Sequence, residues 1–306
     1  MEFLYVLEDL RTPFLDAVVS ALTHLGGEMV FLVLALVVFW CADKRQGYYL
    51  LSVGFMGTLV NQFLKITCRI PRPWVRDPNF TIVESARAEA TGYSFPSGHS
   101  TSSVGTFGVL ATEGKRLWLR LLAVAMCFLV PLTRLYLGVH TPADVLVGSA
   151  IPLFFIIVLR PVFYHSDGKA MPWLLGIMLT VSAAFVLYME LFPFPSDVDQ
   201  DNLHSALKNS YTLLGSLAGM IAVWLADRKR SFSTEAPFRV QVLKIVLGLA
   251  LVLAVKEGMK LPLEAIFGGH MIARALRYIL VVLTAGILWP MTFPKLIAWD
   301  ERKTRK

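Results

Sequence analysis

Long apolar segments separated by short polar ones make up most of this 306-residue chain. A transmembrane α-helix needs about 20 consecutive, mainly apolar residues, and nine segments approach that length. They lie at 27–41, 48–65, 98–112, 117–136, 142–164, 172–192, 209–226, 240–256 and 271–292. The first and third are short by this measure, and residues 13–25 either extend the first or lie flat as an amphipathic helix. The pattern predicts an all-α, polytopic transmembrane bundle of about nine spans.

Composition supports a membrane as the solvent of this chain. Hydrophobic residues account for 56% and charged residues for only 17% of the sequence, whereas soluble proteins carry about 25% charged residues. The net charge of +7 would raise the question of nucleic acid in a soluble chain. Here the basic residues fall mostly in short clusters between apolar segments, which fits anionic lipid headgroups. We therefore expect the bilayer, and no nucleic acid, as a partner.

The distribution of Lys and Arg predicts which loops face the cytoplasm. Basic clusters mark alternate connections, at 44–45, 115–116, 160–169, 228–230 and 302–306. The intervening loops, 66–97, 137–141, 193–208 and 257–270, are then predicted to face outward. One outward segment breaks the rule, because five basic residues lie within 65–97: Lys65, Arg69, Arg72, Arg76 and Arg87. This excess of positive charge indicates either a different topology or a function.

Three polar motifs stand at the predicted outward ends of the spans. They are Lys65-Ile-Thr-Cys-Arg-Ile-Pro-Arg72-Pro73, Pro96-Ser97-Gly98-His99, and Thr133-Arg134 followed by His140-Thr-Pro-Ala-Asp144. The first follows the second span, the second precedes the third span, and the last connects the fourth span to the fifth. The predicted topology therefore places all three motifs at one membrane face.

Each motif also has a purely structural explanation. Lys65 at the end of a span is typical of a snorkelling lysine. Ser97 suits the N-cap of a helix. Thr141-Pro142 followed by Asp144 has the form of a capping box. Because the motifs occur together, in order and on one face, with two histidines and three basic residues, we favour a function over these separate explanations.

The cationic residues suit the binding of a phosphate group. A phosphate monoester carries up to two negative charges and several acceptor oxygens, so its site needs fixed cations and oriented donors. Arg72 and Arg134 offer forked guanidinium donors, and Lys65 offers a point charge.

The second motif suits the same task through its backbone. Ser97, Gly98 and His99 present their N–H groups at a predicted helix N-terminus, where the helix dipole favours an anion. Gly98 has no side chain, so the backbone can approach the anion closely. We predict that phosphate binds between this helix start and the one at Asp144.

The two histidines suit a two-step phosphoryl transfer. Asp144 follows His140 by four residues, so its carboxylate can hold one ring nitrogen and leave the other as a nucleophile. The same carboxylate would stabilise the imidazolium of a phosphohistidine. His99 is the candidate general acid in the first step and general base in the second. The cations already supply charge stabilisation, so we predict no metal and no other cofactor.

Together, the motifs K-x6-R-P (65–73), P-S-G-H (96–99) and S/T-R-x5-H-x3-D (133–144) resemble the signature of the type 2 phosphatidic acid phosphatase superfamily of membrane phosphatases. The resemblance covers roughly residues 14–165. It implies a phosphatase core at 1–165, followed at 166–306 by additional transmembrane helices of unknown role. The resemblance implies the same site, in which phosphate is bound by Lys65, Arg72, Ser97, Gly98 and Arg134, His140 is the nucleophile held by Asp144, and His99 is the acid. Thr133 stands where serine is commoner, and the hydroxyl is kept.

The predicted function is hydrolysis of a lipid phosphate or polyprenyl pyrophosphate at the outward face of a membrane, most simply the bacterial cytoplasmic membrane. Undecaprenyl pyrophosphate, phosphatidylglycerol phosphate, phosphatidic acid and sphingoid phosphates all remain admissible substrates. The plan of about nine spans is similar to that of glucose-6-phosphatases and sphingosine-phosphate phosphatases of the superfamily, which shifts the choice of substrate only slightly. One alternative is a phosphatase for a soluble ester such as a sugar phosphate. Another is a non-catalytic lipid-binding protein, which leaves the two histidines and the aspartate without a purpose. Vanadate-dependent haloperoxidases share the residue set but are soluble.

Overall fold

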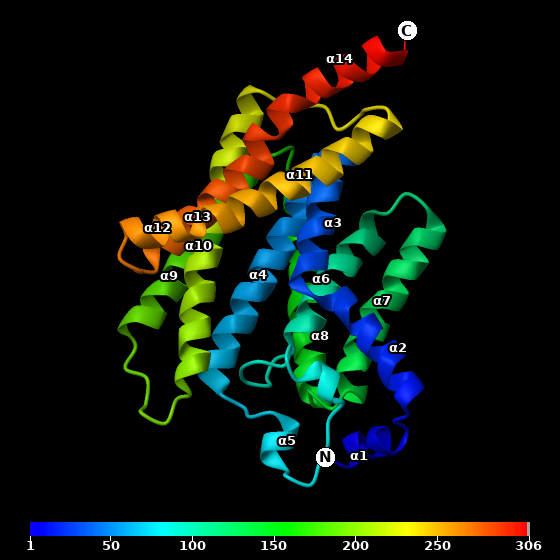
Figure 1. Cartoon of the computed structure of the whole chain (residues 1–306), viewed down its shortest axis with the longest axis vertical. Helices are drawn as coiled ribbons and strands as arrows, with labels where there is room; N and C mark the ends of the chain where they lie inside the picture. Colours follow the sequence, from blue (N-terminus) through cyan, green and yellow to red (C-terminus); the bar gives the residue numbers. More distant parts are fainter. Residues whose placement is uncertain (305–306) are drawn as a thin grey trace. The chain divides into compact units, whose positions relative to one another are not determined.

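The computed structural model describes residues 1–304, and within this range every regular element is helical (Figure 1). The α-helices are α1 (Glu2–Asp9), α2 (Pro13–Thr23), α3 (Glu28–Cys41), α4 (Lys44–Cys68), α5 (Pro73–Arg76), α6 (Gly98–Glu113), α7 (Leu117–Tyr136), α8 (Pro142–Tyr164), α9 (Met171–Leu191), α10 (Gln200–Lys229), α11 (Phe238–Gly258), α12 (Lys260–Ile266), α13 (Ile272–Leu283) and α14 (Phe293–Thr304). Short 3-10 or π turns are η1 (His24–Gly26), η2 (Glu84–Ala86), η3 (Thr284–Leu288) and η4 (Pro290–Thr292). The predicted all-α class is confirmed.

Seven helical stretches of the described chain are long and apolar enough to cross a membrane. They are Lys44–Arg76, Leu117–Tyr136, Pro142–Tyr164, Met171–Leu191, Gln200–Lys229, Phe238–Ile266 and Ile272–Lys303. The pair Pro13–Gly26 and Glu28–Cys41, bent by 49°, supplies an eighth if it counts as one span. The remaining predicted segment is α6, which has 16 residues and is shorter than a full span. The chain is an integral membrane protein of about the predicted number of spans.

The chain divides into two compact units that are each built from separate stretches of sequence. The first contains Met1–Leu34, Tyr49–Gly168 and Pro193–Ala206, and the second contains Ala35–Tyr48, Lys169–Phe192 and Leu207–Lys306. All three motifs lie in the first unit. The division into a core at 1–165 and an extension at 166–306 stays a prediction.

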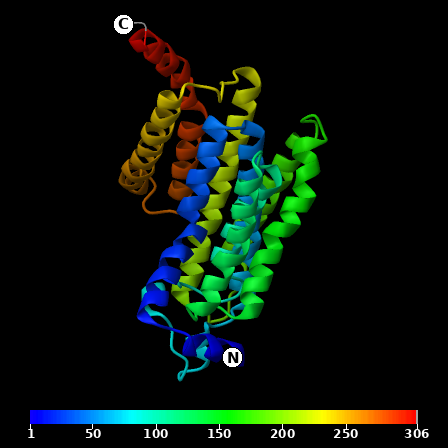
Figure 2. The same ribbon diagram turned by 90° about the vertical axis from the view of Figure 1, so that its right-hand side faces the viewer.

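In the first unit, α6 packs against both α7 and α8 (Figure 2). Small residues allow close approach of helices in a membrane, and the contact between α6 and α8 depends on Gly148. A Cβ atom at Gly148 would lie 2.6 Å from the carbonyl oxygen of Ser97. The Ser97 N–H also donates to the Asp144 carbonyl oxygen at 2.9 Å. The N-termini of α6 and α8 are therefore held side by side.

The long loop between α4 and α6 is packed onto the turn between α7 and α8. Leu4, Phe80, Ile82, Leu135 and Val145 form one buried apolar cluster there. A second cluster joins Ala86 and Ala90 of the loop to Leu137 and Val139 of the turn. Burial of apolar side chains on both sides stabilises the loop in one position. The two clusters therefore fix the loop backbone that leads to the start of α6.

The second unit is held by its own close helix contacts. A Cβ atom at Gly215 of α10 would lie 2.2 Å from the Ala275 carbonyl oxygen of α13, so the two helices touch backbone to backbone. The indole N–H of Trp40 donates to the carbonyl oxygen of Ala285 at 2.8 Å, and Ala285 lies in the π turn η3. Lys44 pairs with Asp227 at 2.7 Å. These contacts involve none of the motif residues.

Candidate active site

The predicted site residues lie at helix ends and loop positions of the first unit. Lys65 is in the last turn of α4, Arg72 precedes α5, Ser97 caps α6, Gly98 and His99 begin α6, Arg134 is in the last turn of α7, His140 is in the following turn, and Asp144 is in the first turn of α8. The charged members interact electrostatically with one another. The structure therefore brings the three motifs together at one end of the first unit's helices.

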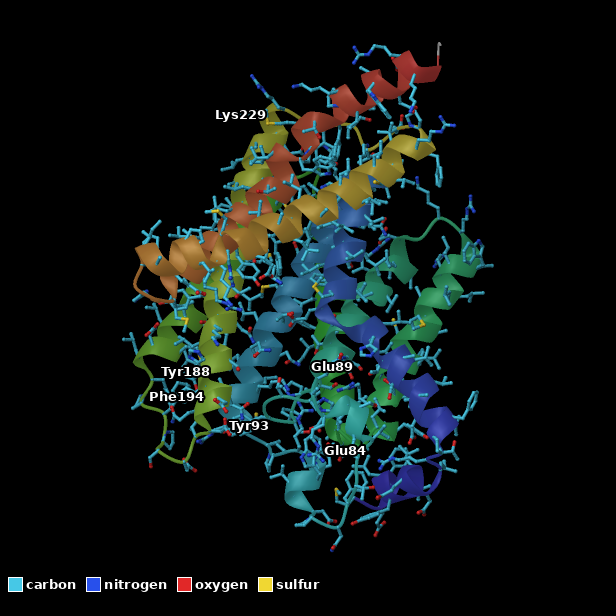
Figure 3. All side chains as sticks on the ribbon, viewed as in Figure 1. Glu84, Glu89, Tyr93, Tyr188, Phe194 and Lys229 are labelled. Atoms are coloured by element: carbon cyan, nitrogen blue, oxygen red, sulfur yellow. The ribbon has the colours of Figure 1, made fainter. Side chains whose placement is uncertain are left out.

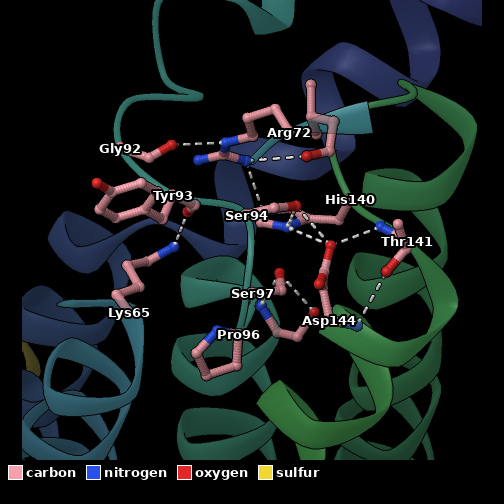
Figure 4. Close-up of polar contacts among 12 residues, drawn as sticks. Lys65, Arg72, Gly92, Tyr93, Ser94, Pro96, Ser97, His140, Thr141 and Asp144 are labelled. Atoms are coloured by element: carbon pink, nitrogen blue, oxygen red, sulfur yellow. Dashed lines mark hydrogen bonds and ion pairs between the residues drawn. The ribbon is translucent and has the colours of Figure 1, made fainter. Parts of the chain in front are cut away.

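His140 is buried between a carboxylate and a guanidinium (Figure 4). Its Nδ1 lies 3.5 Å from Oδ2 of Asp144, and its Nε2 lies 3.0 Å from Nη1 of Arg72. Because a carboxylate accepts hydrogen, this geometry favours the tautomer with the hydrogen on Nδ1. The lone pair is then on Nε2, which faces the arginine. Desolvation by burial, and next the charge of Arg72, hold the pKa of His140 well below its ordinary value.

Asp144 is held by two donors besides His140. Its Oδ2 accepts from the Ser94 hydroxyl at 2.5 Å and from the Thr141 backbone N–H at 2.7 Å. Thr141 accepts in turn from the Asp144 N–H at 3.3 Å, which completes the predicted capping box. The structural explanation of Asp144 is thus correct, and the same oxygen also contacts the histidine. A helix cap fixes the carboxylate at the ring.

Backbone carbonyls of the loop 91–93 hold two of the predicted cations. Arg72 donates from Nε to Gly92 at 3.0 Å, from Nη2 to Thr91 at 2.7 Å and from Nη1 to Val139 at 2.9 Å. Lys65 donates from Nζ to Tyr93 at 2.6 Å. Carbonyl oxygens carry no formal charge, so they orient the two side chains without adding negative charge to the site.

Two N–H-bearing nitrogens of Arg134 have no hydrogen-bond acceptor among residues 1–304. It is fully buried, and its Nη1 donates to the Thr23 hydroxyl at 2.8 Å. Its Nε and Nη2 are buried without a hydrogen-bond partner in the described chain. A buried unpaired donor is costly, and such groups are rare in native structures. Two unpaired donors on one guanidinium fit a bidentate anion such as phosphate.

The start of α6 differs in one respect from the prediction. Ser97 is the N-cap, and its hydroxyl accepts from the N–H of Ser100 at 3.3 Å. Its own N–H is not free for an anion, because it donates to the Asp144 carbonyl. The prediction that Ser97 offers its N–H to phosphate is therefore wrong for this structure. The N–H groups of Gly98 and His99, at the first turn, remain as helix-terminal donors.

Four residues near the motifs were absent from the prediction. Ser94 contacts Asp144, Thr23 contacts Arg134, and Glu89 lies between His24 and His99. The polar pair Thr23-His24 stands in an otherwise apolar segment before Gly26-Gly27, which was a usable signal for a helix break. Ser94 and Glu89 carry no signal of their own in a polar loop.

A segment from beyond the motifs braces the loop that holds the cations. Residues 193–206 belong to the same compact unit, and the Asp199 N–H donates to the Tyr93 hydroxyl at 3.4 Å (Tyr93 is labelled in Figure 3). A Cβ atom at Gly92, which has a positive φ of 73°, would lie 2.8 Å from Oδ1 of Asn202. Glycine is needed there for both conformation and space.

Metal binding requires grouped ligand side chains. Among residues 1–304, no three His, Cys, Asp or Glu side chains are grouped in that way. Metal independence stays a prediction, which chelation tests.

Fold and site define a polytopic helical membrane protein with a buried cationic site that contains two histidines. A family model described as PAP2 superfamily matches residues 45–168, and one described as PAP2 superfamily phosphatase, transmembrane extension, matches residues 211–301. The chain belongs to the PAP2 superfamily of phosphatases. This agrees with the resemblance carried by the three motifs.

The chain is similar to several proteins that are phosphatases by name. The chain is 28% identical to phosphatidylglycerophosphatase B of Bacillus subtilis (strain 168), over 48% of this chain and 76% of that protein. It is 26% identical to a probable sphingosine-1-phosphate phosphatase of Dictyostelium discoideum, over 72% of this chain and 56% of that protein. It is 28% identical to an undecaprenyl-diphosphatase of Sulfolobus acidocaldarius, over 44% of this chain and 64% of that protein. The chain thus covers less than two thirds of the last two. No solved structure matches the chain.

Proposed function

We propose that this protein hydrolyses a lipid phosphate or polyprenyl pyrophosphate at the extracytoplasmic face of its membrane, through a phosphohistidine on His140. The observation that carries the proposal is the position of His140, with Nδ1 directed at Asp144 and Nε2 directed at Arg72. An oriented neutral imidazole next to a cation that attracts phosphate has the arrangement of an activated nucleophile.

In the first step, the lone pair on Nε2 of His140 attacks phosphorus. The bond from phosphorus to the leaving oxygen breaks, and His99 gives that oxygen a proton. The ring of His140 becomes positively charged, and Asp144 stabilises this charge through Nδ1. In the second step, water attacks phosphorus while His99 takes one of its protons, and the bond between phosphorus and nitrogen breaks. Both histidines then return to their starting protonation.

The cations stabilise the charge that the phosphoryl group carries. Arg134 supplies two donors without a partner in the described chain, Arg72 supplies its guanidinium from the connection before α5, and Lys65 supplies a further donor from the last turn of α4. Because Nη1 of Arg72 donates to Nε2 of His140, a bound phosphate must replace that hydrogen bond before attack. Preorganised donors of this kind contribute most of their effect in the transition state.

The relatives support a lipid as the substrate class. One relative, matched over 76% of its own length, is a phosphatidylglycerophosphatase by name, and another, matched over 72% of this chain, is a probable sphingosine-1-phosphate phosphatase. The third is named for undecaprenyl diphosphate. All three substrates present a phosphate on a long apolar chain, which a membrane-spanning protein can admit from the bilayer.

Phosphate release from a panel of substrates tests this proposal. Purified protein in lipid nanodiscs is given phosphatidylglycerophosphate, sphingosine 1-phosphate, a polyprenyl pyrophosphate and glucose 6-phosphate. We expect turnover of at least one lipid and a loss of about 10⁴-fold or more in His140→Ala. His204→Ala, an exposed histidine of α10, is the matched control. Turnover of the sugar phosphate alone would support the soluble-ester alternative, and full activity of His140→Ala would overturn the mechanism.

The cysteines allow a test of orientation. Cys68 is exposed at the end of α4 close to the motifs, whereas Cys41 and Cys127 are partly buried. A variant that keeps only Cys68 should react with a membrane-impermeant maleimide added outside intact cells. The control is a cysteine-free protein with Glu235→Cys in the predicted cytoplasmic loop, which should react only after lysis. The opposite pattern would place the site on the cytoplasmic side.

A further inference from the structure

A carboxylate joins two histidines next to the cationic site. Oε2 of Glu89 lies 3.3 Å from Nε2 of His99, and Oε1 lies 2.9 Å from Nδ1 of His24. The exposed fraction of the side chain is 18% for His99, 38% for Glu89 and 64% for His24. The three groups therefore form a row from the buried site towards solvent, and the motifs account only for the first of them.

The break in the first long helix places His24 in this row. η1 interrupts the helical path between α2 and α3, and it packs against α6. A Cβ atom at Gly26 would lie 3.1 Å from the His99 carbonyl oxygen and 2.5 Å from Cγ1 of Val130, so only glycine permits this approach. Thr23, which precedes His24, accepts a hydrogen bond from Arg134. Of two consecutive residues at the break, Thr23 thus contacts Arg134 of the site, and His24 contacts Glu89.

Glu89 is held in place by its neighbours in the chain. Ala86 and Ala90 on either side are buried in the cluster with Leu137 and Val139. The carboxylate itself, on the residue labelled in Figure 3, lies 3.3 Å from Nε2 of His99. Apolar packing therefore fixes the loop backbone at Glu89, and the contact with His24 orients the carboxylate.

The electrostatic surroundings of His99 give this carboxylate a purpose. The groups that face His99 from the packed elements are Lys65 of α4, Arg72 of the loop, Arg134 of α7, His24 of η1 and His140 of the α7–α8 turn. All of them are cationic or neutral, and positive neighbours disfavour an imidazolium. Glu89 is the carboxylate in contact with the ring. A general acid must carry a proton before the first step, and a carboxylate at this distance favours the protonated ring.

We propose that Glu89 is a positioning residue for His99, and that His24 holds Glu89 in turn. The proposal rests on the proposed function, in which His99 is the general acid. Glu89 accepts the hydrogen on Nε2, which leaves Nδ1 to exchange a proton with the substrate. In the first step Nδ1 gives its proton to the leaving oxygen, and in the second it takes one from water. Nε2 keeps its hydrogen throughout, so the proton balance closes on His99 alone.

The leaving group decides how much an acid contributes, and this provides the test. An alkoxide leaving group needs a proton, whereas the anion of a nitrophenol does not. In Glu89→Gln we expect kcat for a lipid alkyl phosphate to fall about tenfold or more, with KM within about twofold. The kcat for an aryl phosphate with a good leaving group should change less than about twofold. A role in folding alone would lower both rates equally.

The pH profile gives a second readout. Removal of the carboxylate makes the imidazolium less favourable, so His99 loses its proton at lower pH. The alkaline limb of kcat should move down by about one pH unit. Glu89→Asp keeps the charge, so its alkaline limb of kcat should lie close to that of the wild type. Glu84→Gln is the matched control, because Glu84 lies in the same loop, is 72% exposed and pairs with Arg87 at 2.7 Å.

Ring titration by NMR distinguishes this proposal from the proposed function. The chain has six histidines, and selective ring labelling with single-site variants assigns those of residues 24 and 99. The pKa of His99 should fall in Glu89→Gln and stay unchanged in Glu84→Gln, whether or not a substrate is turned over. Unchanged titration of His99, or an unchanged alkyl-to-aryl ratio in an active enzyme, overturns the role of Glu89. An inactive wild-type protein with the shifted titration overturns the phosphatase proposal instead.

Discussion

Replacement of Asp144 by asparagine removes one charge from the site while it preserves most of the hydrogen-bonding geometry. The donors from Ser94 and Thr141, and Nδ1 of His140, all approach the same carboxylate oxygen, Oδ2. The carbonyl oxygen of an asparagine can occupy that position and accept from Ser94 and Thr141, with Nδ1 of His140 still next to it. The substitution therefore tests the charge of the carboxylate separately from its role as a helix cap.

The distance and burial of the pair set the expected size of the effect. Both side chains are 2% exposed, so solvent screens the pair weakly. At 3.5 Å and an effective dielectric constant of about 20, two unit charges interact by about 5 kcal/mol. The full charge on His140 develops only when the phosphohistidine forms, so this energy is lost mainly from the transition state. We expect kcat to fall roughly 10³- to 10⁴-fold.

The assay is steady-state release of phosphate from the lipid substrate, together with trapping of labelled phosphoenzyme. Thr141→Ala is the control, because it removes the capping hydroxyl that accepts from the Asp144 N–H. We expect this control to lose about 1 kcal/mol of stability while its activity is kept. A kcat within tenfold of wild type in Asp144→Asn would refute the reasoning, since the carboxylate would then not stabilise a cationic His140.

Three further predictions concern the cations, the nucleophile and metal ions. Arg134→Lys keeps the charge but removes the guanidinium fork, so KM and the inhibition constant of inorganic phosphate should rise about 10- to 100-fold; unchanged phosphate inhibition would contradict the assignment. Burial and the charge of Arg72 lower the pKa of His140, so Nε2 stays unprotonated at pH values where an ordinary histidine is protonated. Activity should therefore be lost only as the pH falls through this lowered pKa. The acid limb of kcat/KM should therefore lie below about pH 6.5, and a limb above it would argue against His140 as nucleophile. Dialysis against EDTA should leave kcat within about twofold, and a loss restored by a divalent cation would reveal a metal.

The structure gives contacts for four of the five basic residues in the segment 65–97. Lys65 and Arg72 point their donors into the site. Arg87 pairs with Glu84 of its own loop, and Arg69 lies 3.7 Å from Asp197. The anomaly in the charge pattern thus identified the correct loop, although only two of its basic residues belong to the site.

Local sequence features were sufficient to predict much of the site. A helix end is marked by capping residues and by the change from apolar to polar positions, and these features place Ser97 and Asp144 correctly. The four-residue spacing from His140 to Asp144 spans about one helical turn, so their contact was predictable. The contacts of Glu89 and Ser94 were not, because a loop of this length has no periodicity that determines which side chains point inward.

By itself, the sequence determined the membrane environment, the helical class, the superfamily and the order of the motifs, because hydropathy and helix-end signals act over a few neighbouring residues. The tertiary structure decided which atoms meet. It directs Nε2 of His140 at Arg72, uses the Ser97 N–H within the protein, leaves two donors of Arg134 without an acceptor in the described chain, and brings Glu89 to His99. These contacts depend on how a long loop and a broken helix pack against distant helices, and packing over such separations cannot be deduced from the spacing of residues along the chain.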